Sequence, residues 1–263
     1  MVEIRDLHIK FHARDREAVA GIDLTLPDGE ILGLVGESGS GKSVTAMSIS
    51  GLLDREIADC SGEILLDGED MLRLKGEDFR RLQGEKIGVI FQEPMSALDP
   101  LQKIGKQVEE SLRLHTKMSA AERRAAALEA MEIAELDRVE ELYNKYPFEL
   151  SGGMLQRVMI AAAIISKPSL LVADEPTTAL DVTLQGQILE LLKKLNQQYG
   201  MSILFISHNL HVVRKLCSRV AVMQLGKIVE EGETEQILRD PQHDYTKELI
   251  AAIPTRDKRF GKK

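Results

Sequence analysis

The chain has 263 residues and a formal net charge of −8, from 34 Lys and Arg against 42 Asp and Glu. Hydrophobic residues make up 43% and charged residues 29%, which excludes wholesale disorder. An acidic chain without a basic block is a poor candidate for sequence-independent binding of nucleic acid. Two distant cysteines, Cys60 and Cys217, exclude a disulfide framework and a cysteine-based metal cluster.

No uninterrupted apolar run approaches the ~18 residues of a membrane-spanning helix. The first residues lack the apolar stretch of a signal peptide. We therefore expect a cytosolic chain that reaches a membrane only through partners. The basic ending, residues 258–263, is expected to be a solvated tail.

Alternating or continuous apolar segments predict strands in the first third of the chain. The strands are expected at residues 3–10, 21–26, 31–35, 62–68 and 87–91. One helix is expected among them, over residues 43–53. From residue 94 to 150 the strand formers disappear, and Ser119 to Glu122 resembles a capping box that opens a helix ending near Glu135. We interpret residues 94–150 as a helical lobe inserted between strands.

The last part of the chain alternates between helices and strands. Helices are predicted over 154–165 and 182–199 and again after residue 208, and strands over 170–173, 202–207 and 220–224. Strands that alternate with helices of this length predict an α/β fold with a mostly parallel, doubly wound sheet.

A glycine-rich segment after the strand at 31–35 matches the pattern G-x-x-x-x-G-K-[ST]. Its residues are Gly36, Glu37, Ser38, Gly39, Ser40, Gly41, Lys42 and Ser43. Glycines let successive backbone N–H groups point at phosphate oxygens, and the following helix adds the positive end of its dipole. Lys42 would supply a charge to the β- and γ-phosphates, and the Ser43 hydroxyl would bind Mg²⁺. The alternative is a flexible Gly/Ser turn, which the flanking strand and helix disfavour.

Two acids, Asp174 and Glu175, follow the apolar strand at 170–173. Ligands of open α/β sheets gather at this edge. Asp174 would hold Mg²⁺, directly or through water, and Glu175 would orient and deprotonate the water that attacks the γ-phosphate. The alternative is a pair of solvated acids at a helix entrance.

Gln92 and His208 also directly follow predicted strands. Either side chain would reach the γ-phosphate or its attacking water, although each alone is also typical of a loop. His208 and His211 could instead form a metal pair, but no third ligand of suitable type lies near in sequence.

The segment Leu150-Ser151-Gly152-Gly153-Met154 lies about twenty residues before the acidic pair, at the start of a predicted helix. With the preceding motifs in this order, the chain resembles the nucleotide-binding subunit of an ABC transporter over nearly all of its length, 1–263. The resemblance implies a P-loop NTPase fold with a mostly parallel sheet core, an N-terminal antiparallel β part, the helical lobe at 94–150 and a C-terminal tail at 233–263.

By this resemblance Gln92 is the Q-loop residue and a Mg²⁺ ligand, and His208 is the switch histidine. Ala179-Leu180-Asp181 matches the D-loop, which places Asp181 at the nucleotide. Ser151, Gly152 and Gly153 belong to the signature, which caps the γ-phosphate bound by a partner subunit, so two subunits sandwich two ATP molecules head to tail. The alternative is a plain N-capped helix. Met154 stands where the family usually has Gln, which removes one polar group and leaves the Ser and Gly donors in place.

Phe11 lies 25 residues before Gly36, about where this family places an aromatic residue that stacks on adenine. Phe11 could equally be a core residue, and both interpretations stay open here.

Several segments resemble the dipeptide, oligopeptide and nickel import ATPases, namely residues 36–43, 91–100, 146–149, 174–181 and 243–246. Longer members carry an extension that can hold several cysteines, and its lack favours the shorter nickel- or metal-type members. The resemblance implies an enzyme that hydrolyses ATP with Mg²⁺ and powers uptake of nickel, a metal chelate, or di- or oligopeptides.

The implied partners are a second ABC ATPase, related or identical, and two transmembrane permeases that receive the motion through the helical lobe. An extracytoplasmic solute-binding protein would take part indirectly, and no nucleic acid would be involved. The expected location is peripheral, on the cytoplasmic face of the cell membrane. The alternative is a soluble ABC-type ATPase for cofactor assembly or for clamping nucleic acid.

Overall fold

The strands form two sheets in the computed structural model, which describes residues 1–74, 76–178 and 180–252. The smaller sheet is antiparallel with the order β2-β1-β4-β5. Its strands are β1 (Val2–Phe11), β2 (Val19–Leu26), β4 (Ala58–Leu66) and β5 (Glu69–Asp70). The N-terminal antiparallel part of the predicted fold is therefore confirmed.

The larger sheet has the order β10-β9-β3-β8-β7-β6 and is parallel except for β10. Its strands are β3 (Ile31–Val35), β6 (Ile87–Ile90), β7 (Leu170–Asp174), β8 (Ser202–Ser207), β9 (Arg219–Gln224) and β10 (Lys227–Glu233). This confirms the mostly parallel core. The pattern analysis did not predict β10, because this edge strand carries three glutamates and little apolar surface.

The two faces of the larger sheet pack into different apolar clusters, because successive strand residues point to opposite faces. Leu32 and Leu34 of β3 belong to the cluster shared with the smaller sheet. Ile31 and Val35 of the same strand belong to the cluster of the helical side. The buried runs that predicted β3, β7 and β8 therefore reflect strands covered on both faces.

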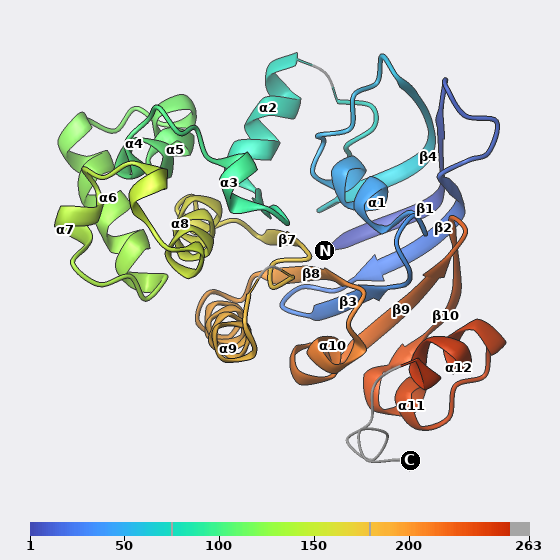
Figure 1. Ribbon diagram of the computed structural model, residues 1–263. Coiled ribbons are helices and arrows are strands. Elements are labelled where there is room, and N and C mark those ends of the chain that lie inside the picture. Colours follow the sequence, from blue (N-terminus) through green and yellow to red (C-terminus); the bar gives the residue numbers. More distant parts are fainter. Residues whose placement is uncertain (75, 179, 253–263) are drawn as a thin grey trace, which may run out of the picture.

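Helix α1 (Lys42–Ile49) belongs to the cluster between the two sheets, while α9 (Val182–Tyr199) and α10 (Leu210–Leu216) belong to the opposite cluster (Figure 1). The prediction of a helix to residue 53 was wrong. Helix α1 ends at Ile49, and Gly51 adopts a φ of +68° that leaves the right-handed helical region.

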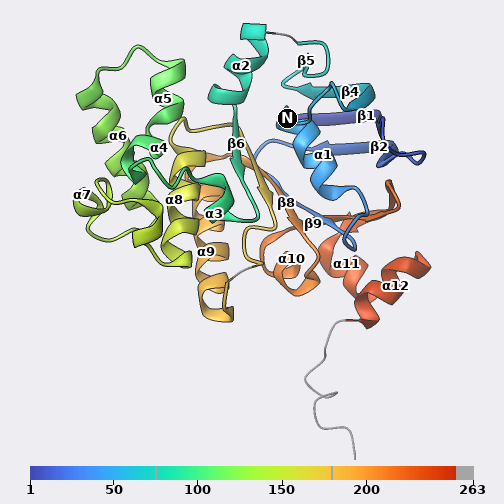
Figure 2. The same ribbon diagram turned by 45° about the horizontal axis from the view of Figure 1, so that its top comes forward.

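The expected helical lobe lies at one side of the molecule in both views (Figure 2). Its helices are α3 (Pro94–Ala97), α4 (Ile104–Val108), α5 (Glu110–His115), α6 (Ala120–Ile133), α7 (Val139–Leu142) and η1 (Pro147–Glu149). The capping box that predicted α6 is present, with Ser119 Oγ accepting from Glu122 N at 3.3 Å. Helix α8 (Gly152–Ile164) contacts α4, α6 and β6, so it joins the lobe to the larger sheet. Helix α2 (Gly76–Glu85), before β6, was not predicted.

The region predicted as a C-terminal tail contains two helices, α11 (Thr234–Arg239) and α12 (Asp244–Ala251), which lie beside β9 and β10 (Figure 1). The basic ending at 258–263 lies outside the described residues. Within the described ranges, no helix combines the length and apolarity needed to cross a bilayer.

Candidate functional site

The loop between β3 and α1 requires glycine at two positions. A Cβ on Gly36 would stand 2.1 Å from the backbone oxygen of Met223, and one on Gly41 would stand 2.5 Å from that of Ala18. Gly41 also has a φ of +113°, which only glycine adopts without strain. The loop therefore curls tightly against the β1–β2 connection and the end of β9.

The Lys42 amine is folded back onto this loop. Its Nζ donates to the carbonyl oxygens of Gly36 and Glu37, each at 2.8 Å. Burial lowers the pKa of Lys42, and the carboxylates of Glu175, Asp174 and Glu37 partly oppose this shift. The cation is thus held among backbone dipoles, close to where an anionic ligand would neutralise it.

Ser43 and Asp174 meet at the start of α1. Ser43 Oγ donates to Asp174 Oδ1 at 3.3 Å. Burial raises the pKa of Asp174, and the hydrogen bond from Ser43 and the charge of Lys42 oppose that shift. A hydroxyl and a carboxylate oxygen fit the donor set that Mg²⁺ prefers. Burial disfavours the charged forms of both Lys42 and Asp174. A bound anion beside Lys42 and a bound cation beside Asp174 would stabilise those charged forms.

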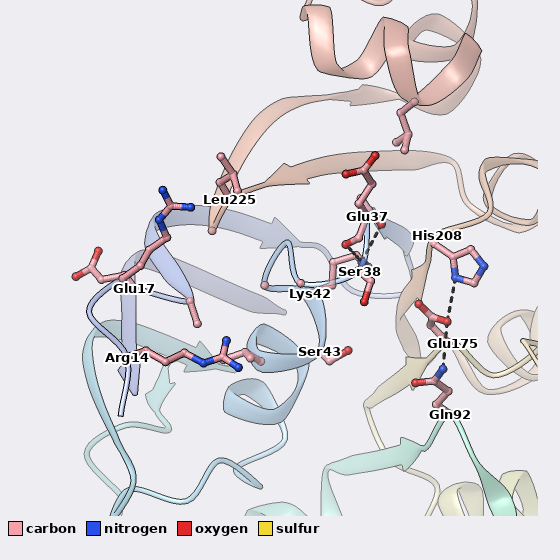
Figure 3. A pocket seen from close by; sticks show the side chains of 18 of the residues that line it. Arg14, Glu17, Glu37, Ser38, Lys42, Ser43, Gln92, Glu175, His208 and Leu225 are labelled. Atoms are coloured by element: carbon pink, nitrogen blue, oxygen red, sulfur yellow. Dashed lines mark hydrogen bonds and ion pairs between the residues drawn. The ribbon is translucent and has the colours of Figure 1, made fainter. Parts of the chain in front are cut away.

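Glu175 is the centre of a second group of polar side chains, drawn at the right of Figure 3. Its Oε2 lies 3.0 Å from His208 Nδ1 and accepts from Thr178 Oγ1 at 2.8 Å and from Gln92 Nε2 at 3.5 Å. Glu175 also adopts a φ of +46°, an uncommon conformation for this residue. Three strand ends, those of β6, β7 and β8, deliver these groups to one point.

A cavity of about 750 Å³ joins the loop to this group. The predicted residues on its wall are Gly36, Glu37, Ser38, Gly39, Gly41, Lys42, Ser43, Gln92, Glu175 and His208. Ser40 is not on the wall. Its side chain is buried, and its carbonyl accepts from Gly226 N at 2.9 Å.

Phe11 does not line this cavity. It packs against the cluster of the N-terminal sheet, and the Arg14 guanidinium lies 5.9 Å from the ring centroid. Arg14, Arg16 and Glu17 of the β1–β2 connection line the cavity instead, and Figure 3 shows Arg14 and Glu17 on the side away from Glu175. No sequence motif marked these residues, because only the tertiary fold brings the β1–β2 connection next to the phosphate loop. Contact of Phe11 with adenine stays a prediction.

The predicted signature lies apart from the phosphate loop. Ser151 and Gly153 line a different cavity of about 470 Å³, with Arg157 and Leu184. Ser151 begins α8 without a side-chain hydrogen bond to the first turn, and a Cβ on Gly152 would meet nothing within 4 Å. The hydroxyl is therefore exposed rather than used as a cap within the described part of the chain.

Asp181 caps α9 through bonds from Thr183 N at 2.9 Å and Leu184 N at 3.0 Å. Its neighbour Ala179, part of the predicted D-loop, lies outside the described residues. For His211, the structure shows a helix-start residue whose N–H donates to Asn209 Oδ1 at 3.0 Å. The described ranges contain no group of three or more His, Cys, Asp or Glu placed to hold a metal.

The family comparison agrees with this geometry. The profile of the ABC transporter family matches residues 19–178, from β2 through Glu175 and Thr178. The chain belongs to the ABC transporter family. It is an ATPase domain of that family, and relatives named as ATP-binding proteins of transporters match it over most of its length.

Two relatives illustrate the extent of similarity. The peptidoglycan transport ATP-binding protein YejF of Agrobacterium fabrum is 51% identical over 97% of this chain, but the match spans only 47% of YejF. The oligopeptide transport ATP-binding protein OppD of Bacillus subtilis is 45% identical over 97% of this chain and 72% of OppD. The chain thus spans about half the length of the first relative and most of the second.

Among solved structures, the ATP-binding cassette MJ0796, in a dimeric post-hydrolysis state bound to ADP and Pi, superposes with a TM-score of 0.80. It is 32% identical, and the match covers 89% of this chain and 99% of MJ0796. The protein cbiO1 of Clostridium perfringens, part of the ABC transporter complex cbiONQ, gives a TM-score of 0.77 at 25% identity over 91% of this chain and 90% of cbiO1. These matches confirm the predicted fold.

Proposed function

We propose that this chain binds and hydrolyses ATP to power an ABC importer for di- or oligopeptides. The observation that carries the proposal is the single cavity that joins the glycine-rich loop with Glu175, His208 and Gln92. Relatives named for peptide transport, such as OppD, support the peptide cargo. Nickel or a metal chelate, the cargo of the shorter subfamily, stays a prediction.

The loop residues would hold the triphosphate. Backbone N–H groups of residues 38 to 43 at the N-terminus of α1 would donate to phosphate oxygens, and Lys42 would move its amine from the loop carbonyls to the β- and γ-phosphates. Ser43, Asp174 and Gln92 would hold Mg²⁺, which supplies charge neutralisation and a template for the phosphates when bound.

The Glu175 group would act on the attacking water. Glu175 would orient the water and accept its proton at Oε2, in line with the γ-phosphate. His208 and Thr178 hold this carboxylate oxygen at 3.0 and 2.8 Å, which positions it at the end of β7. Hydrolysis would then leave ADP and inorganic phosphate in the cavity.

A second subunit would complete the site. Ser151 and Gly153 line a different cavity from the loop of their own chain, so they and Gly152 would serve the γ-phosphate of a partner in a head-to-tail dimer. The dimeric MJ0796 structure supports this assembly. Asp181 would lie at the same interface. The partner would be a related or identical ATPase, and two permeases would receive the motion through residues 94–150.

The complex would lie on the cytoplasmic face of the membrane, with a solute-binding protein delivering the cargo from outside. Relatives named for transport speak against the alternative of a soluble ATPase for cofactor assembly or nucleic-acid clamping. Copurification of this chain with a multi-spanning membrane protein is the expected result. A complex free of membrane proteins would contradict the proposal.

The catalytic assignment is tested with Lys42→Ala and Glu175→Gln in the assembled complex. Lys42→Ala should weaken ATP binding at least tenfold, while Glu175→Gln should keep ATP affinity and lose hydrolysis by roughly 100-fold or more. Glu235→Gln, a surface carboxylate paired with Arg214, is the matched control and should change neither. Undiminished hydrolysis in Glu175→Gln would remove Glu175 from its role.

The cargo is tested by growth of a strain that lacks the chain. Growth should fail when peptides are the only source of an essential amino acid and be unaffected when nickel is limiting. The reverse result would replace peptides by nickel as the cargo.

A further inference from the structure

Residues 243–246 are one of the segments on which the resemblance to the import ATPases rests, yet they have no role in the proposed mechanism. This segment begins α12, and Tyr245 lies one residue into that helix with its side chain buried. The Tyr245 hydroxyl accepts a hydrogen bond from the backbone N–H of Glu37 at 2.9 Å. Two parts of the chain 208 residues apart are joined at the phosphate loop by this bond.

The bond acts on a peptide that also holds the lysine. Glu37 donates its N–H to Tyr245, while its carbonyl oxygen accepts from Lys42 Nζ at 2.8 Å. The carbonyl of the preceding residue, Gly36, accepts from the same amine at 2.8 Å. The orientation of these two peptide groups therefore determines the position of the Lys42 amine. Tyr245, which lies outside the loop, fixes that orientation through its hydrogen bond.

The position of α12 is itself held in place. The Glu230 carboxylate on β10 accepts N–H bonds from Gln242 at 2.7 Å and His243 at 3.1 Å, just before the helix. His243 then caps α12 by accepting from Tyr245 N at 3.2 Å. These contacts hold the start of α12 against the edge of the larger sheet, so the position of Tyr245 relative to the loop is fixed.

The same helix lines the nucleotide cavity. Leu249 and Ala252, one and two turns after Tyr245, are on the wall with Glu37 and Ser38. The C-terminal region predicted as a tail is thus part of the pocket boundary. Figure 3 shows this helix above Glu37.

We propose that Tyr245 is a positioning residue that holds the Glu37 peptide so that the phosphate loop is ready for nucleotide. This inference rests on the proposed nucleotide site. Tyr245 touches the loop and not the reacting atoms, so it acts on binding of the phosphates common to ATP and ADP and leaves turnover at saturating ATP nearly unchanged.

The test is Tyr245→Phe in the full chain, which keeps the ring and removes the acceptor. Titration with fluorescent mant-ATP and mant-ADP should show affinities weaker by roughly three- to tenfold for both, as expected for one lost hydrogen bond. In the nucleotide-free chain, hydrogen exchange at the Glu37 amide should become faster, because this N–H loses its acceptor while the ring stays in place.

Tyr143→Phe is the matched control, because the Tyr143 side chain is also buried and its hydroxyl donates to Glu109 Oε2 at 3.1 Å in the helical lobe. It should leave both affinities within about twofold of the parent chain. Tyr245→Leu, which also removes the ring, should bind nucleotide more weakly than Tyr245→Phe.

Three outcomes would overturn the inference. They are unchanged affinity in Tyr245→Phe, an unchanged exchange rate at the Glu37 amide, and equal weakening in Tyr143→Phe. A parent chain that binds no mant-ATP would instead refute the proposed function. The two failures are therefore distinguishable.

Discussion

Replacing Gly88 with Ala should push helix α8, which follows the signature residue Ser151, away from the larger sheet. Gly88 lies on β6, where an added Cβ would stand 2.3 Å from the backbone oxygen of Ala163 on α8 and 3.1 Å from Leu171 Cδ1. Since an ordinary contact begins near 3.4 Å, helix and strand would have to separate by roughly 1 Å. One contact is with backbone and the other is with a buried leucine, so neither partner can move into solvent.

Overpacking of this kind costs about 1–3 kcal/mol. For a domain of this size, Gly88→Ala should lower the Tm by roughly 3–10 °C in a calorimetric scan of the nucleotide-free chain. The displaced α8 carries Ser151 at its N-terminus, so ATP hydrolysis by the dimer should also fall.

Gly186→Ala is the matched control. Gly186 lies in α9, where a Cβ would meet nothing within 4 Å, so the substitution should stabilise the helix by about 0.5–1 kcal/mol. A Gly88→Ala chain with an unchanged Tm would refute the steric reasoning. An equal loss of stability in Gly186→Ala would show that the loss reflects glycine replacement in general.

Three further predictions follow from local contacts. Burial raises the pKa of Asp174 above its ordinary value of 3.8, so the protonated carboxyl stabilises the fold below that pH, and this stabilisation is lost as the pH rises through the native pKa. Asp174→Asn should therefore raise the Tm of the nucleotide-free chain at pH 7 and flatten the pH dependence, while abolishing Mg²⁺-dependent hydrolysis. Ser119→Ala removes the cap of α6 and should lower the Tm by about 3 °C in thermal scans, with the Glu122 N–H left without its partner. Burial raises the pKa of both thiols, most strongly for Cys217, so a disulfide reagent should modify Cys60 first and Cys217 only on unfolding.

Much of the α/β core was predictable because strands buried on both faces are continuous apolar runs. The bounds predicted for the helix Val182–Tyr199 and the strand Ser202–Ser207 match the structure. Their ends carry clear signals, since Asp181 caps the helix and Gly200, with a φ of +66°, ends it. The signals were weaker for β10, whose polar residues suit an exposed edge, and for α12, whose pattern does not reveal which surface it covers.

The sequence by itself determined the chemistry of the loop, because glycine spacing, one lysine and one hydroxyl are local properties of eight consecutive residues. It also placed the acids and the polar residues at strand ends, since parallel strands bring their carboxyl ends to one edge. Only the tertiary structure decided that Thr178, Gln92 and His208 all contact Glu175 Oε2. It also decided that Phe11 lies off the cavity wall. The contact of Tyr245 with Glu37 was equally hidden, because a hydrogen bond across 208 residues depends on how the chain packs and not on any local pattern.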